Sequence, residues 1–139
     1  MKKQVSKTTR KVAVIIHYLS LGLLNCLIIF QENIDALVLL LTGIIISLAI
    51  VIISFIYAFG LTRLWILTHS SYKKLDERQI QVSYSALSVS YNIFSIILLS
   101  ILMFYSLSGI TIHILVVGSL IYVSHILPGS VIACTEKQV

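Results

Sequence analysis

Apolar residues along this chain fall into four long runs. The runs cover residues 12–30, 36–59, 82–107 and 110–127. A helix of about 20 residues, rising about 1.5 Å per residue, crosses the roughly 30 Å hydrocarbon core of a bilayer. Strands of a membrane barrel would instead alternate apolar and polar residues over about ten positions. The pattern therefore predicts an all-α, polytopic membrane protein with four antiparallel transmembrane helices in a single domain, residues 1–139.

Short polar or turn-forming segments predict where these helices begin and end. Asp35 is a candidate N-cap for the second span. Ser108-Gly109 predicts a tight turn before the fourth span, and Pro128-Gly129 predicts its end because proline disrupts a helix interior. Residues 61–81 form the largest polar segment inside the apolar sequence. We expect this segment to be a helical cytoplasmic hinge between two helical hairpins.

Composition agrees with a membrane location. The chain is 58% hydrophobic and 11% charged, with a mean hydropathy of +1.04, whereas soluble domains carry about 25% charged residues. The two cysteines, Cys26 and Cys134, fall in different segments, so we expect no disulfide between them.

Charge placement predicts the orientation in the membrane. All ten Lys and Arg residues lie before residue 12, within the hinge, or in the C-terminal tail, while Glu32 and Asp35 lie between the first two spans. The positive-inside rule then places both termini and the hinge in the cytoplasm, with the spans in the plasma (cell inner) membrane. We expect the basic groups to contact anionic lipid headgroups. Nucleic acid is not expected as a partner, because these groups are not interleaved with base-stacking aromatics.

The hinge carries the densest set of charges. Trp65 and Tyr72 are candidate anchors in the headgroup layer. Asp76 and Gln79 are spaced as in a capping box, which would start the third helix. Alternatively, the charged segment docks a partner protein. The docking candidates are Lys73, Lys74, Asp76, Glu77, Arg78 and Gln79.

The segment KKLDERQIQVSYSAL, residues 73–87, resembles the region before the third span in a group of small prokaryotic membrane proteins of unknown function. In that group, a basic patch and a DER-type motif separate two hairpins. The resemblance implies four spans and a plasma-membrane location, and it implies no activity.

Polar residues inside the spans predict packing faces. The third span has a stripe at helical spacing, and each of the other spans has small or polar residues that could face it. Such a stripe is costly against lipid, so we expect it to meet protein or water. Ordinary helix packing and a water-lined path in an oligomer both remain possible interpretations. The candidates are Gln81, Ser85, Ser88, Asn92 and Ser95 in the third span, and Asn25, Gly43, Ser47, Ser54, Gly118 and Tyr122 elsewhere.

No catalytic, cofactor-binding or metal-binding motif is visible in the sequence. His17 and His125 could meet near the cytoplasmic side, but two unpaired imidazoles are the simpler expectation. We expect no enzymatic activity and no cofactor. Two functions remain open. One is an accessory or regulatory subunit that docks a partner through the hinge, and we expect the bundle to associate further as a homo-oligomer or with a membrane or cytoplasmic protein. The other is an oligomeric channel or membrane-permeabilising protein lined by the polar stripe.

Overall fold

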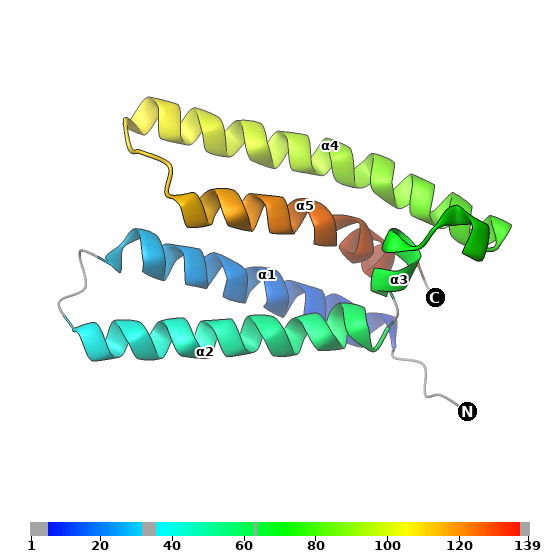
Figure 1. Ribbon diagram of the computed structural model, residues 1–139, viewed down its shortest axis with the longest axis horizontal. Coiled ribbons are helices and arrows are strands. Elements are labelled where there is room, and N and C mark those ends of the chain that lie inside the picture. The colour runs from blue at the N-terminus through cyan, green and yellow to red at the C-terminus, as the bar shows by residue number, and fades with distance from the viewer. Residues whose placement is uncertain (1–5, 32–35, 63, 137–139) are drawn as a thin grey trace.

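The computed structural model describes residues 6–31, 36–62 and 64–136, and every regular element in them is helical (Figure 1). Four of the helices are long and apolar enough to cross a membrane. The prediction of an all-helical protein with four helices of membrane-spanning length is therefore confirmed. In chain order the elements are α1 (Lys7–Ile29), α2 (Leu37–Phe55), the π-helical turn η2 (Ile56–Gly60), α3 (Leu64–His69), the 3₁₀ turn η3 (Tyr72–Lys74), α4 (Glu77–Ser108) and α5 (Ile114–Thr135).

The four long helices lie roughly along one axis (Figure 1). The start of α1, the end of α5 and the short helix α3 share one end, which we call the basic end because its cations include Lys7, Arg10 and Lys11. The turn between α4 and α5 lies at the opposite end, the turn end. There Gly109 adopts a left-handed conformation, with φ 68°, that favours glycine. α1 packs against both α2 and α5, whereas α4 packs mainly against α5.

The best-packed region of the molecule lies at the basic end, where α1, η2, α3 and α5 meet. Phe59, Leu64, Ile126 and Ile132 are each less than 2% exposed. A Cβ atom on Gly129 would lie 3.1 Å from the Phe59 ring, so glycine permits a close approach of α5 to η2 at this point. This packing fixes the polar side chains that are described below.

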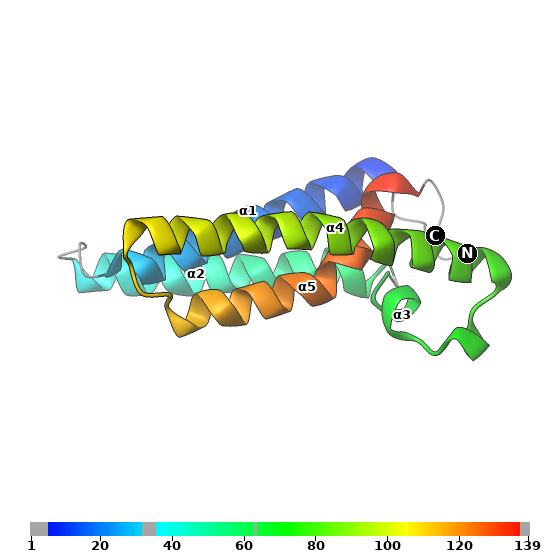
Figure 2. The same ribbon diagram turned by 90° about the horizontal axis from the view of Figure 1, so that it is seen from above.

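The prediction that Pro128-Gly129 ends the fourth span is wrong, because α5 continues to Thr135. Pro128 is buried within the helix, and α5 bends in its orange-to-red final part (Figure 2). The continued turns are held from α1. Lys7 Nζ donates to the Thr135 carbonyl at 2.7 Å, and Arg10 donates to the Glu136 carbonyl at 2.9 Å. Two cations at the carboxyl end of α5 also suit the helix dipole.

Other boundaries differ by a few residues. α1 begins at Lys7, which is before the predicted span, and α5 begins at Ile114, where the His113 side chain accepts from the Leu115 N–H at 3.2 Å. The predicted hinge extends to residue 81, but α4 begins at Glu77. The predicted cap Asp35 lies outside the described residues.

Candidate functional site

A buried hydrogen-bonded cluster centred on His17 links three helices near the basic end. His17 is 0% exposed. Its Nδ1 atom is 2.9 Å from Ser54 Oγ of α2, and its Nε2 atom is 3.0 Å from the Tyr122 hydroxyl of α5. Ser54 already donates to the Val51 carbonyl at 3.1 Å. It must therefore accept from His17 Nδ1–H, which leaves Nε2 to accept from Tyr122.

Two further polar pairs join α1 to α5. Tyr18 donates to Ser130 at 2.9 Å, because Ser130 uses its own proton on the Ile126 carbonyl. Nearer the turn end, Ser119 donates to the Asn25 side-chain oxygen at 3.0 Å. The predicted packing roles of Asn25 and Tyr122 therefore correspond to direct contacts between helices. Such bonds contribute about 1 kcal/mol each in membrane helices.

The small residues of α2 form the expected inward stripe. Ser47, Ser54 and Ala58 are buried, and a Cβ on Gly43 would contact Leu27 of α1 at 3.2 Å. Gly118 behaves differently. It is exposed, and a Cβ there would meet nothing within 4 Å, so this glycine does not form a close helix contact within the chain.

The inward face of α4 differs from the predicted polar stripe. Ser83, Ala86 and Ser90 are the buried residues of this helix. Ser88 is two residues from both Ala86 and Ser90, a spacing that places it on the opposite side of a helix. The side that carries the predicted stripe is called the outer face below. Its exposed members are Gln81, Ser85, Ser88 and Asn92, while Ser95 is half-buried.

Asn92 lies on the outer face and carries a side-chain amide that needs hydrogen-bond partners. Ser88 and Ser95 are its neighbours along the stripe, and exposed apolar side chains, including Val89, Ile93 and Ile96, flank it on one side. Its amide makes no hydrogen bond with any part of the chain that the structure describes, and the same holds for the side chains of Ser85 and Ser88. Ser95, by contrast, donates to the Tyr91 carbonyl at 2.8 Å. The chain thus leaves an uncovered amide on an apolar surface, where lipid offers no partner.

The DERQ segment caps α4, as one of the two interpretations predicts. The Asp76 carboxylate accepts from the Gln79 N–H at 2.7 Å, and the Gln79 side chain accepts from the Asp76 N–H at 3.1 Å. Arg78 lies 3.7 Å from Glu136 at the end of α5. Lys73, Lys74 and Glu77 are exposed. Three of the six docking candidates thus have contacts within the chain, and three are available at the surface.

The imidazoles pair differently from either sequence-based expectation. His17 bonds Tyr122 rather than His125, so it is neither interfacial nor unpaired. His125 is exposed, and its ring lies nearly parallel to that of His69, with centroids 6.4 Å apart. Trp65, a predicted anchor, stacks on His69 at 3.8 Å. The side chain of the other anchor, Tyr72, lies outside the described part.

Several of these contacts had only a weak signal in the sequence. The serines of α2 recur at helical spacing, which is why their inward stripe was predictable. The pairing of Tyr18 with Ser130 depends on α5 continuing past Pro128, and the sequence favours the opposite.

Both cysteines are free. Among the described residues, no group of three or more His, Cys, Asp or Glu side chains could hold a metal ion. No protein-family model, curated protein or solved structure matches this chain.

Proposed function

We propose that this chain is a small accessory or regulatory membrane subunit that forms a homodimer through the outer face of α4. One observation carries the proposal: Asn92 and its polar neighbours are exposed among apolar residues and have no partner in the chain. In a bilayer, only protein or water can satisfy these groups. A helix from another subunit would supply the missing partners.

The chemistry of the outer face favours a second copy as that partner. Copies that insert in the same orientation associate about a two-fold axis along the membrane normal, so each residue meets its own counterpart at the same depth. Asn92, Gln81 and Ser88 each carry both hydrogen-bond donors and acceptors, so each can pair with itself. The residues of this face are uncharged, so no like charges oppose each other. A single asparagine can also fix the register of two helices.

In this proposal, the two helix pairs are hairpins joined by a cytoplasmic hinge in the plasma membrane. The support is that Lys7, Arg10, Lys11, Lys73 and Lys74 all lie at the basic end, which the positive-inside rule assigns to the cytoplasm. Of these, Lys11, Lys73 and Lys74 are exposed and would contact anionic lipid headgroups.

Only some of the docking candidates are available on the cytoplasmic surface that would bind a regulated partner. Asp76 and Gln79 are engaged in the capping box, whereas Lys73, Lys74 and Glu77 are exposed and free to contact another protein. We expect Lys73→Ala with Lys74→Ala to abolish cross-linking to a partner in native membranes, read by mass spectrometry. Lys11→Ala removes an exposed cation elsewhere at the basic end and serves as the matched control. Partner cross-links that survive the double substitution would remove the docking role.

The dimer is tested by Asn92→Leu, which keeps the shape of the side chain and removes its hydrogen bonds. We expect a loss of about 1 kcal/mol or more, which weakens the dimer about fivefold or more. Energy transfer between labelled copies in liposomes measures this directly. Thr42→Val is the control, because Thr42 is exposed on α2 and donates to its own helix at 2.7 Å. Equal association of the two variants would contradict the proposal.

A channel remains the second candidate, because the same polar face could line a water path if several copies formed a ring. It would produce conductance or dye leakage in liposomes, and Asn92→Leu would change it. A dimer without leakage supports the accessory subunit, whereas leakage that depends on Asn92 supports the channel.

A further inference from the structure

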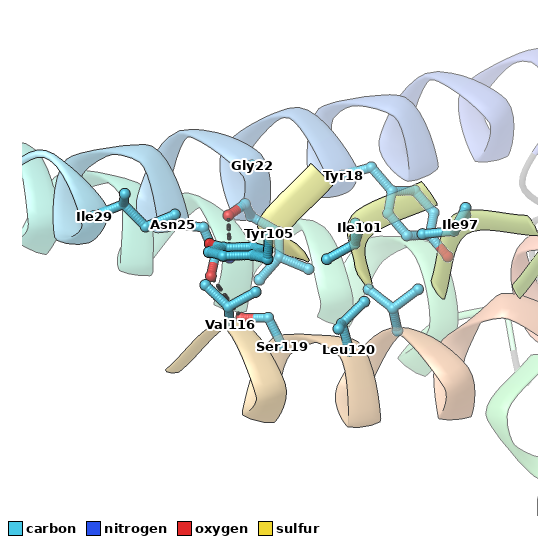
Figure 3. Close-up of a pocket in the computed structure, with 12 residues that line it drawn as sticks. Tyr18, Gly22, Asn25, Ile29, Ile97, Ile101, Tyr105, Val116, Ser119 and Leu120 are labelled. Atoms are coloured by element: carbon cyan, nitrogen blue, oxygen red, sulfur yellow. Dashed lines mark hydrogen bonds between the residues drawn. The ribbon is translucent and has the colours of Figure 1, made fainter. Parts of the chain in front are cut away.

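A cavity of about 380 Å³ lies between α1, α4 and α5 in the half of the molecule toward the turn end (Figure 3). Its size falls within the usual range of ligand pockets, about 300–1,000 Å³. The walls are formed by Tyr18 to Ile29 of α1, Ile97 to Tyr105 of α4, and Val116 to Val123 of α5. The cavity is therefore elongated along the helices. Its α4 wall alone extends about 12 Å, at about 1.5 Å per residue.

The walls offer almost nothing to a polar ligand. Apolar side chains such as Leu21, Ile101 and Leu120 dominate the lining. The two polar side chains in its middle satisfy each other, since Ser119 donates to the Asn25 oxygen at 3.0 Å and the Asn25 amide donates to the Leu21 carbonyl at 2.9 Å. An apolar cavity of this kind does not hold water. It would therefore be filled by hydrocarbon.

The cavity opens to the surface at Gly22. This glycine lines the cavity and is exposed, and a Cβ atom placed on it would meet nothing within 4 Å. The opening lies on a membrane-spanning helix, where lipid chains are the surrounding solvent. A second copy bound to the outer face of α4 would leave the opening uncovered, because Ile97 and Ile101 lie on the opposite side of that helix from Asn92. A helix is also about 10 Å wide, which is too wide for this cavity.

We propose that this cavity binds one acyl chain of a membrane lipid from the leaflet at the turn end. Lipid chains lie along the bilayer normal, as the cavity does. Tyr105, Ile29 and Val116 mark its outer end, and the Tyr105 hydroxyl has no hydrogen-bond partner in the described part of the chain. A tyrosine at that depth suits the headgroup layer. The chain enters from the side at Gly22, its headgroup end lies beside Tyr105, and its methyl end reaches Tyr18, Ile97 and Val123.

The test uses vesicles of phosphatidylethanolamine and phosphatidylglycerol in which a fraction of the lipid carries a photoreactive diazirine on one acyl chain. We expect cross-links to concentrate on cavity residues such as Ile101 and Leu120. A diazirine near the headgroup should label Ile29 and Tyr105, and one near the methyl end should label Ile97 and Val123. Mass spectrometry of the labelled peptides reads both the site and its depth.

Gly22→Leu fills the opening and should abolish the labelling of Ile101 and Leu120. Gly118→Leu is the matched control, because Gly118 is also an exposed span glycine with open space, and it does not line the cavity. Val116→Phe fills the cavity from α5 and serves as a second variant if Gly22→Leu fails to fold. Labelling that is spread evenly over all exposed apolar residues, or unchanged by both filling variants, would overturn the proposal. Reversed depth labelling would overturn the assigned leaflet.

Discussion

α4 and α5 are sequence neighbours that pack against each other, yet the polar residues of α5 bond within the chain, whereas several polar residues of α4 face outward. On α5, Ser119, Tyr122 and Ser130 each bond a side chain of α1. On α4, Ser85, Ser88 and Asn92 face outward and bond nothing in the described chain. In the most apolar stretch of each helix, 28% of the residues of α5 are buried, against 6% for α4. α5 is thus built for contacts within the chain, and α4 retains a face for contacts outside it.

This difference between α4 and α5 predicts that polar residues on α5 affect the stability of one copy, whereas those on the outer face of α4 affect the association between copies. A polar residue on α5 stabilises the fold of one copy, so its removal should lower the free energy of unfolding. A polar residue on the outer face of α4 contributes nothing to that fold, so its removal should change only association. Single substitutions on the two helices can therefore test the comparison.

The largest effect is expected for Gly129→Leu on α5. A Cβ atom at this position would already lie 3.1 Å from the Phe59 ring, so a larger side chain forces α5 away from η2. We expect a loss of about 3 kcal/mol in the free energy of unfolding, measured by denaturant titration in micelles. Gly118→Leu, on the same helix in open space, should change it by less than about 0.5 kcal/mol. Similar losses for both would mean that α5 is not the tightly packed helix.

Tyr122→Phe comes next. It leaves His17 Nε2 buried without a hydrogen bond, which should cost about 1.5 kcal/mol in the same titration. Tyr57→Phe is the control, because Tyr57 is exposed and its hydroxyl has no partner in the described chain. If both changes were silent, the α5 polar groups would not stabilise the fold as described.

Asp76→Ala should cost about 1 kcal/mol, because it removes the carboxylate that accepts from the Gln79 N–H. Asparagine caps helices as well as aspartate does, so Asp76→Asn should restore most of the loss. Hydrogen exchange of the first α4 amides reports the fraying locally. A loss with alanine that asparagine does not restore would show that the charge of Asp76, rather than its capping bond, is what matters.

The smallest effect on unfolding is expected for Asn92→Leu, with a change of less than about 0.5 kcal/mol in a monomeric micelle. The same variant should lose association in liposomes. A clear loss of monomer stability would contradict the comparison, because Asn92 would then have a partner inside the chain.

Local signals in the sequence predicted much of the fold and less of the site. Long apolar runs gave the four helices, and the spacing of Asp76 and Gln79 gave the capping box. The end of α5 was missed because proline normally disrupts a helix. Here Lys7 and Arg10, more than 100 residues away, bind the last carbonyls. The pairing of His17 with Tyr122 was missed for a similar reason, since it depends on the packing of α1 against α5.

The sequence predicted a polar stripe on α4, but it did not show which side of the helix packs against the rest of the chain, because both sides carry polar residues. Ser83 and Ser90 face inward, while Ser88 and Asn92 face outward. Periodicity alone cannot choose between two polar stripes on one helix. The choice depends on which face α5 covers, and only the three-dimensional packing supplies it.

The most direct test of the outer face is disulfide cross-linking between copies in native membranes. Single cysteines would be placed at successive α4 positions in a chain in which Cys26 and Cys134 are replaced by alanine. We predict maximal cross-linking at Ser85, Ser88 and Asn92, with minima at Ser83, Ala86 and Ser90. Maxima at the buried positions, or cross-linking without helical periodicity, would contradict the assignment of this face as the contact between copies.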